Sequence, residues 1–494
     1  MSGGCLIGAL GGAYTSDWWG RRKNLVLGIG IFMFGGSIQI TASRNWLHML
    51  LGRFTAGLGL GNLSLGVPMF QSESAPREIR GAVVASYQLF ITLGIFFCSS
   101  IGEILHKHET NDWAWRILIG VGMILSIPIG IGIMTVPESP RWLAGQGDWE
   151  AARHSLARLR GLVDKPDDDL IEDDINEMRE VLDREALAGK GSWVECFRNR
   201  SGSRRTVYRT WLGIAIHFMQ QWTGVNYFFY YGGDVFKAAG IQDPLQTQMI
   251  LGGINCFMTL AGPYLVEKLG RRWPLFVGSL WQAACLAVFA TVGHMHPPTT
   301  ANTTGIYMIA SSCLFIASFA ATWGPMVWVV IGETFPLRLR AKQAALATAG
   351  NWFGNFMLGF ITPVATNHID YQYGFVFVAS NLVAAVIVFF FLYETRMLSL
   401  ESVDLLYNDM DVKAWNSAKW VPPGYITREE RDVGHFRRLS VALNPHEWRR
   451  GDQGPRTGNN GAKTGDEGPT AENKRQPKDG VAEHGAESKQ DQEG

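Results

Sequence analysis

The sequence predicts an all-α membrane protein, because apolar runs long enough to cross a bilayer recur along its first 393 positions. A bilayer core of roughly 30 Å needs about 20 apolar residues per helix, and many runs of that length are hard to place in one soluble core. Small residues are frequent inside the runs, as close helix packing in lipid favours. A polar tail follows the last run.

The pattern predicts about 11 membrane spans. They cover residues 2–16, 24–42, 47–70, 81–103, 115–136, 208–231, 247–266, 273–293, 305–330, 341–364 and 372–393. Lys and Arg are retained on the cytoplasmic side of a membrane. Alternate loops carry them, for example Arg21, Arg22 and Lys23, and later Arg338 and Arg340. We therefore expect these loops and the tail to be cytoplasmic.

The chain contains an internal repeat. DWWGRR at 17–22 matches EKLGRR at 267–272, and PESPR at 137–141 resembles YETR at 393–396. The register of the repeat predicts two related halves of six helices each, with the first helix of the first half absent from the chain. Paired halves are typical of secondary transporters, which bind their substrate near mid-membrane between the halves.

Composition divides the chain into four expected regions. They are an N-terminal helical bundle, a cytoplasmic loop with short amphipathic helices, a C-terminal helical bundle and a cytoplasmic tail, at 1–137, 138–207, 208–393 and 394–494. Within the loop, apolar residues recur at helical spacing, at Leu170, Ile171, Ile175, Met178 and Leu182. After about residue 444 the tail has almost no bulky apolar residue, and we expect it to be disordered.

Several classes of protein find no support in the sequence. The formal net charge is +0, so charge does not indicate a nucleic-acid partner. The 6 cysteines are scattered without a metal-ligand spacing, and we expect no metal and no cofactor. No nucleophile–base pair stands out, so we expect a protein that is not an enzyme.

The segment FMQQWTGVNYFFYYG at 218–232 combines a membrane-like composition with neutral hydrogen-bonding groups. Gln220, Gln221 and Asn226 each both donate and accept hydrogen bonds. In an unbroken helix Gln221 and Asn226 would lie about 140° apart, so we expect a break near Gly224 that lets them converge. The alternative is that these amides only join one helix to another.

The ordered motifs resemble the sugar porters of the major facilitator superfamily, in the style of fungal monosaccharide (hexose) transporters. They are DWWGRR, GRFTAGLGLG, SESAPREIRGA, PESPRWL, QQWTGVNYFFYY, EKLGRR, WGPMVWVVIGETFPLRLRAK and GNWFGNF, and the resemblance extends to about residue 405. The sequence departs from the family pattern at Ala13, where Gly is usual. It departs again at Tyr393, Arg396 and Met397, which replace the usual Pro, Lys and Gly.

The resemblance implies a major facilitator fold and transport of a monosaccharide, such as glucose, by alternating access with proton symport. It also implies a monomeric, multi-pass protein of the plasma membrane whose partners are the sugar, protons and the lipid bilayer. The long polar tail leaves a second function open, that of a transporter-like sugar sensor that signals through its tail.

The resemblance also nominates residues that bind the sugar. A sugar is neutral and covered in hydroxyl groups, so neutral amides suit it, and an aromatic ring can face its apolar side. The nominated residues are Gln88, Gln220, Gln221, Asn226, Asn255, Trp328 and Asn351. Packing is the alternative role for each.

Acidic and basic residues alternate at matched positions near the cytoplasmic ends of the spans. Anchoring by positive charge explains the arginines but not the acids. We expect a salt-bridge network of exposed pairs, worth about 0–1 kcal/mol each, that closes the inner side. Its members are Asp17, Arg21, Arg22, Glu73, Arg80, Glu138, Arg141, Glu267, Arg271, Arg272, Glu333, Arg340 and Glu394.

Two further positions carry expectations of their own. Arg53 lies in the outer part of a span, where a lone charge is costly and usually functional. In proton-coupled relatives the equivalent Arg neighbours an Asp of the first helix, which makes Arg53 the candidate for proton coupling. Asn302 begins an NTT sequon in an expected external loop and is a candidate for glycosylation.

Overall fold

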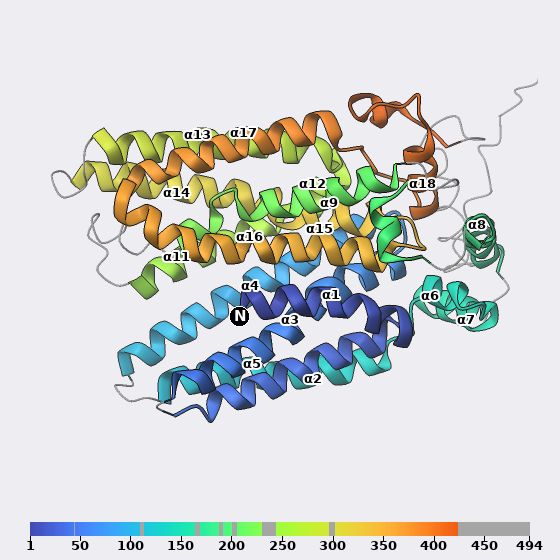
Figure 1. The fold of residues 1–494 in the computed structure, drawn as a ribbon, viewed down its shortest axis with the longest axis horizontal. Coiled ribbons are helices and arrows are strands. Elements are labelled where there is room, and N and C mark those ends of the chain that lie inside the picture. Colours follow the sequence, from blue (N-terminus) through green and yellow to red (C-terminus); the bar gives the residue numbers. More distant parts are fainter. Residues whose placement is uncertain are drawn as a thin grey trace, which may run out of the picture. The chain divides into compact units, whose positions relative to one another are not determined.

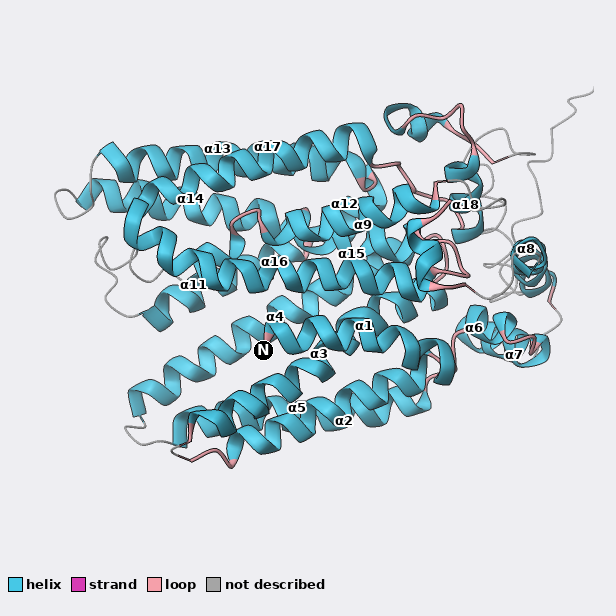
Figure 2. Cartoon of the chain, viewed as in Figure 1, coloured by secondary structure: helices cyan, strands magenta, loops and turns pink. Residues whose placement is uncertain are grey.

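The computed structural model describes residues 1–43, 45–108, 113–163, 168–186, 191–199, 205–229, 244–295 and 302–422. Over these residues the chain forms helices joined by loops and contains no strand, which confirms the predicted all-α class (Figure 2). All of them belong to one compact unit, Met1–Pro445.

The first five long helices are α1 (Ser2–Trp19), α2 (Arg21–Ile40), α3 (Trp46–Ser74), α4 (Arg80–His108) and α5 (Trp113–Thr135). Helices α1 and α2 both pack on α3, and α5 packs on α2 (Figure 1). The contact between α1 and α3 is made by their backbones, because a Cβ at Gly61 would lie 1.9 Å from the carbonyl oxygen of Cys5. Small residues at this interface therefore set the helix spacing.

The second group of helices follows the long loop that begins at residue 138. It comprises α9 (Thr206–Gln221), α11 (Pro244–Thr259), α12 (Ala261–Leu269), α13 (Arg272–Met295), α14 (Asn302–Ala321), α15 (Trp323–Thr334), α16 (Arg340–Ile369), η2 (Asp370–Gln372) and α17 (Tyr373–Phe391). Here α13 packs on α14 and α17, and α16 packs on α9. An aromatic core of Tyr227, Phe228, Phe289 and Phe377 joins them. Across the two groups α1 lies against α16, and α4 lies against α11, α12 and α15.

Helices cover the expected spans, although three of the spans are interrupted. Seven stretches of the described residues are both long and apolar enough to cross a membrane. The predicted break near Gly224 is confirmed, since α9 ends at Gln221, Gly224 has a φ of 104°, and residues 225–229 are helical again. Only glycine adopts this φ without strain.

The other two breaks, between α11 and α12 and between α14 and α15, were not predicted. Each lies just before a proline, Pro263 and Pro325. A proline has no N–H to donate to the carbonyl four residues earlier, and its ring disturbs that turn. Apolar length alone could not distinguish these broken helices from straight ones.

Short helices lie together at one end of the bundles (Figure 1). They are α6 (Pro140–Gly145), α7 (Trp149–Leu159), α8 (Asp169–Ala186), η1 (Trp193–Phe197), α18 (Leu400–Asn408) and η3 (Ala414–Lys419). The predicted amphipathic face of α8 is confirmed: Leu170, Ile171, Ile175 and Met178 are buried against Leu156 and its neighbours. The part of the tail expected to be disordered lies outside the described residues.

We predict that Gly61→Ala destabilises the protein by about 1–3 kcal/mol, because its methyl group overlaps the Cys5 carbonyl and must push α1 away from α3. The matched control is Gly30→Ala on α2, where a Cβ meets nothing within 4 Å. Thermal unfolding of the purified variants measures both. Equal midpoints for the two variants would contradict the backbone contact.

Candidate functional site

The amides of the 218–232 segment converge at the end of α9. Gln221 Oε1 accepts a hydrogen bond from Asn226 Nδ2 at 2.5 Å, and Gln221 Nε2 donates to Asn351 Oδ1 at 2.9 Å. Asn351 Nδ2 donates in turn to Gln220 Oε1 at 2.7 Å. The break at Gly224 makes this possible, because it turns Asn226 back toward Gln221. These side chains form one hydrogen-bonded set, which we call the amide chain.

Gln220 also reaches the break between α14 and α15. Its Nε2 donates to the carbonyl oxygens of Trp323 at 2.9 Å and Gly324 at 3.1 Å. Gln88 of α4 approaches the same place from the first half, since a Cβ at Gly324 would lie 3.3 Å from Gln88 Cγ. Gln88 and Gln220 therefore lie near Gly324, one from each half of the molecule.

Trp328 and Asn255 are buried but are not bonded to the amide chain. The ring of Trp328 is contacted edge-on by Tyr87 of α4 and His217 of α9, with centroids 4.9 and 4.8 Å away. Asn255 of α11 has a buried Oδ1 atom without a hydrogen-bond partner among the described residues. Four of the seven nominated residues are thus bonded to one another, and Gln88 lies near Gly324, which Gln220 also contacts. Among the described residues, Asn255 and Trp328 have no bond to this set.

Two members of the set were missed in the sequence, Asn355 and Ser2. Asn355 Nδ2 donates to Gln221 Oε1 at 3.2 Å, and Ser2 Oγ donates to Asn355 Oδ1 at 2.8 Å. Asn355 follows Asn351 by one helical turn within GNWFGNF, which was an available signal. Nothing in the sequence marked Ser2, whose contact depends on the packing of α1 against α16.

The charged residues at the inner helix ends form the same arrangement twice. In the first half Arg21 makes two hydrogen bonds to Glu73, of 3.0 and 3.1 Å. The backbone N–H groups of Arg21 and Arg22 donate to Glu138 at 2.9 and 3.1 Å. One carboxylate thus holds the guanidinium, and a second holds the start of α2.

The second half repeats each of these contacts. Arg271 makes hydrogen bonds of 2.7 and 3.1 Å to Glu333. The backbone N–H groups of Arg271 and Arg272 each donate to Glu394 at 3.0 Å. The matched positions found in the sequence therefore correspond to matched geometry.

Other contacts join the halves directly. Glu267 accepts a hydrogen bond from the backbone N–H of Ala82 at 2.7 Å. Arg340 Nη1 lies 3.8 Å from Glu73 Oε1. These two contacts are single or long, whereas the pairs Arg21–Glu73 and Arg271–Glu333 within each half are bidentate.

The expectation that the pairs are exposed is wrong. The side chains of Arg21, Glu73, Arg271 and Glu333 are 4%, 0%, 1% and 3% exposed. They are buried because the helix ends of both halves meet here, and residues before α6 and after α17 donate further hydrogen bonds to the two carboxylates. Removing one partner of a buried pair costs about 3–5 kcal/mol, far more than for an exposed pair.

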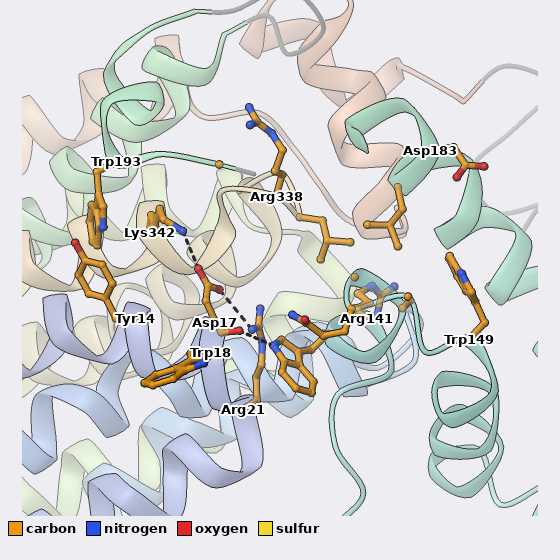
Figure 3. Close-up of a pocket in the computed structure, with 18 residues that line it drawn as sticks. Tyr14, Asp17, Trp18, Arg21, Arg141, Trp149, Asp183, Trp193, Arg338 and Lys342 are labelled. Carbon is orange, nitrogen blue, oxygen red and sulfur yellow. Dashed lines mark hydrogen bonds and ion pairs between the residues drawn. The ribbon is translucent and has the colours of Figure 1, made fainter. Parts of the chain in front are cut away.

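One pair between the halves is partly exposed. Lys342 Nζ of α16 lies 2.8 Å from Asp17 Oδ2 of α1, and the Asp17 side chain is 37% exposed. A cavity of about 900 Å³ opens beside it, lined by residues of α1, α6, α7, α8 and α16 (Figure 3). Figure 3 shows Asp17 between Lys342 and Arg21. Water therefore reaches the network here, at Asp17. Its partner Lys342 was not singled out by the sequence analysis.

The segment after α17 completes the network through Glu401, which was also missed. Arg141 Nε donates to Glu401 Oε1 at 2.9 Å, and Arg141 Nη1 donates to the Glu73 carbonyl oxygen at 2.6 Å. Arg80 Nη1 donates to the carbonyl oxygen of Leu398 at 3.2 Å. Helix α18 is thereby tied to residues that follow the first bundle.

Burial of Glu401 would by itself raise its pKa. The guanidinium of Arg141 beside it, with Arg80 further away, outweighs burial and lowers the pKa of Glu401 to about 2. The carboxylate is therefore charged at any physiological pH, and the ion pair with Arg141 is permanent unless the helices move.

The unusual residue Met397 preserves the turn of its family motif. Its φ is 63°, a left-handed conformation that favours glycine, the residue usual there. Glu394 keeps its bonds to the start of α13 despite the neighbouring substitutions. The change at Met397 thus adds backbone strain without altering the network.

Two expectations remain predictions. Arg53 of α3 is exposed and forms no ion pair with a described residue. The side chain of Asn302 lies outside the described part of the structure. No group of three or more His, Cys, Asp or Glu among the described residues is placed to hold a metal ion.

A family model described as "Sugar (and other) transporter" matches residues 1–407. The chain belongs to this sugar transporter family. A high-affinity fructose transporter of Schizosaccharomyces pombe is 40% identical over 436 residues, which are 87% of this chain and 79% of that protein. The low-affinity glucose transporter HXT3 of Saccharomyces cerevisiae is 39% identical over 427 residues, 85% of this chain and 74% of that protein.

Solved structures confirm the fold of this sugar transporter. The major facilitator proton:xylose symporter XylE, bound to 6-bromo-6-deoxy-D-glucose, matches with a TM-score of 0.72 and 25% identity over 82% of this chain and 87% of XylE. An inward-open conformation of XylE from E. coli matches with a TM-score of 0.59 and 26% identity. The protein is thus a multi-pass membrane protein with a sugar substrate, and it is a transporter and not an enzyme.

We predict unequal effects of breaking two ion pairs at the inner side of the transporter. Arg141→Gln leaves Glu401 buried and unpaired, and should lower the free energy of unfolding by about 3–5 kcal/mol. Lys342→Gln breaks the part-exposed pair with Asp17 and should lower it by about 0–1 kcal/mol. Thermal unfolding in one detergent compares them, and equal losses would show that burial does not govern the network.

The low pKa of Glu401 predicts a pH dependence of stability. Since the folded-state pKa is about 2 and the ordinary value is 4.5, the stabilisation is complete above about pH 4.5 and is lost as pH falls toward 2. The difference in unfolding midpoint between wild type and Glu401→Gln should be constant from pH 8 to pH 5 and shrink between pH 4.5 and pH 3. A difference that changes between pH 8 and pH 6 would contradict this assignment.

Proposed function

We propose that this sugar transporter carries a monosaccharide, glucose or a related hexose, across the plasma membrane by alternating access. The amide chain carries the proposal, because it contains neutral donors and acceptors contributed by both halves of the molecule. The fructose and glucose transporters among its relatives support a hexose as substrate.

The bonding within the amide chain suits weak, reversible binding of a sugar. A sugar that leaves water must replace its lost hydrogen bonds, and each amide can both donate and accept. The amides are bonded to each other here, so a sugar would exchange amide–amide bonds for amide–hydroxyl bonds. Each bond then contributes only about 0.5–1.5 kcal/mol, which lets the ligand leave again. Asn255 and Trp328 would add a free acceptor and an apolar ring face.

The charged network would serve as the inner gate. The bidentate pairs Arg21–Glu73 and Arg271–Glu333 lie within one half each, and would keep each half rigid. Between the halves, the contacts of Glu267 with Ala82 and of Arg340 with Glu73 are single or long, and the buried pair Arg141–Glu401 is the strong contact. Opening the inner side would therefore break the Arg141–Glu401 pair together with these weaker contacts, while each half moves as a body.

Proton symport is part of the proposal, with Arg53 as the residue that senses the proton. XylE is a proton symporter and shares the fold. One proton moving down roughly 100 mV supplies about 2.3 kcal/mol, enough for nearly fifty-fold accumulation of a sugar.

Uptake of labelled glucose by transporter-deficient cells tests the proposal. We predict that Gln220→Ala and Asn226→Ala each lower uptake at least tenfold at equal amounts in the membrane, since each removes a hydrogen-bonding group from the sugar's path. Gln343→Ala is the control, because this buried amide on the same helix as Asn351 donates to Thr206 and Thr210 and not to the amide chain. It should lower stability and leave the KM for glucose unchanged.

The same assay separates the alternatives. Unchanged kinetics in Gln220→Ala and Asn226→Ala would remove these residues from the binding site. Saturable binding of glucose without uptake would indicate a sensor and not a carrier. Uptake that an uncoupler leaves unchanged, without alkalinisation of the medium, would indicate facilitated diffusion.

A further inference from the structure

A groove of about 450 Å³ lies on the membrane-facing side of the second bundle, between α11, α12, α13 and α14. Its walls are apolar and include Leu269, Trp273, Val277, Trp281 and Leu314, which are 52%, 53%, 56%, 52% and 52% exposed. All belong to stretches long and apolar enough to cross a membrane. In a membrane protein such a surface faces lipid, so a lipid chain is the molecule that fills the groove.

The shape of the groove suits an extended chain. Trp273, Val277 and Trp281 follow one another at four-residue intervals on α13, which places them on one face over roughly 12 Å of helix. Trp273 stands at the cytoplasmic end, directly after the paired Arg271 and Arg272. The groove therefore begins at the inner surface of the membrane and continues toward its middle.

A cation stands at the inner end of the groove. Lys268 on α12 is exposed and directly precedes the groove residue Leu269, although it does not itself line the groove, and it forms no ion pair with a described residue. Its Nζ donates to the exposed Tyr264 hydroxyl at 2.7 Å. A lysine at this depth attracts the phosphate of an anionic lipid. The charge thus favours a phospholipid over a sterol, which has no charged group.

The floor of the groove is the break between α14 and α15. Thr322, the residue at this break, lines the groove, and a Cβ at Gly278 of α13 would lie 2.4 Å from its hydroxyl oxygen. On α12, a Cβ at Gly262 would lie 2.7 Å from Pro325. The broken helix is therefore held closely by both walls of the groove.

The same break also faces the amide chain. The carbonyl groups that follow Thr322, those of Trp323 and Gly324, accept the hydrogen bonds of Gln220. A molecule in the groove thus touches one side of the break while Gln220 is bonded to the other side. A shift of Thr322 therefore moves the carbonyl groups of the next two residues, which accept the hydrogen bonds of Gln220.

We propose that the groove binds one acyl chain of an anionic phospholipid of the inner leaflet, with the phosphate at Lys268. The bound lipid holds the α14–α15 break in the geometry that sugar transport needs. The effect on transport rests on the proposed role of Gln220 in sugar binding. Binding of the lipid does not depend on that role.

The test of binding uses the purified full chain, native mass spectrometry, and phosphatidylserine or phosphatidylcholine as probe. We expect retained phosphatidylserine, and about fivefold weaker binding in Lys268→Gln but not in Lys268→Arg. Val277→Trp should fill the groove and abolish binding, whereas Val288→Trp, an exposed position on α13 that does not line the groove, should not. The proposal would be overturned if all variants retained both lipids equally. It would also be overturned if ergosterol, but not phosphatidylserine, displaced the bound lipid.

The test of transport uses the same variants in liposomes with and without phosphatidylserine. We expect wild type and Val288→Trp to take up glucose severalfold faster with phosphatidylserine, and Val277→Trp to be indifferent to it. If phosphatidylserine also accelerated glucose uptake by Val277→Trp, the link between the groove and the break would be overturned. If wild type binds phosphatidylserine but takes up no glucose in either liposome, the proposed hexose transport fails while the lipid site stands.

Discussion

A guanidinium buried at a helix turn must keep a carboxylate beside it, and both halves of this molecule are organised around that requirement. Arg21 and Glu73 satisfy it in the first half, and Arg271 and Glu333 in the second. Because loss of either partner leaves an uncompensated buried charge, each half holds its inner helix ends in one geometry. The two halves can then separate by breaking the weaker contacts between them and the buried pair Arg141–Glu401, while each half stays rigid.

A second constraint acts at mid-membrane, where a polar backbone group has no water to bond. The breaks in α9 and between α14 and α15 expose such groups. Gln220 satisfies the carbonyls of Trp323 and Gly324, and Asn226 turns back to Gln221. The helix breaks therefore gather amides in the membrane interior, and the amides stabilise the breaks. The lipid-facing groove shares one of these breaks, so the protein's lipid surroundings and its polar interior meet at a single turn.

The two halves are related but not equivalent. The segment after α17 folds back under the bundle, and its Glu401 pairs with Arg141 of the segment after the first bundle. The part of the repeat that the structure describes has no counterpart of this contact. Met397 accepts a left-handed conformation in this segment, at a typical cost of about 1–2 kcal/mol, because the bonds of Glu394 on one side and the cap of α18 on the other determine the turn.

The sequence by itself determined the helical spans, the paired halves, the amphipathic face of α8 and the break at Gly224. Apolar length, helical spacing and the backbone freedom of glycine are local properties, so they can be read along the chain. Only the tertiary structure decided that the ion pairs are buried. It also decided that Ser2 and Asn355 join the amide chain and that Lys342 and Glu401 join the charged network. The prolines of α12 and α15 stand at breaks that pack on each other, which the sequence did not show. Burial and partnership depend on which helices lie side by side, and residues hundreds of positions apart carry no local sign of that.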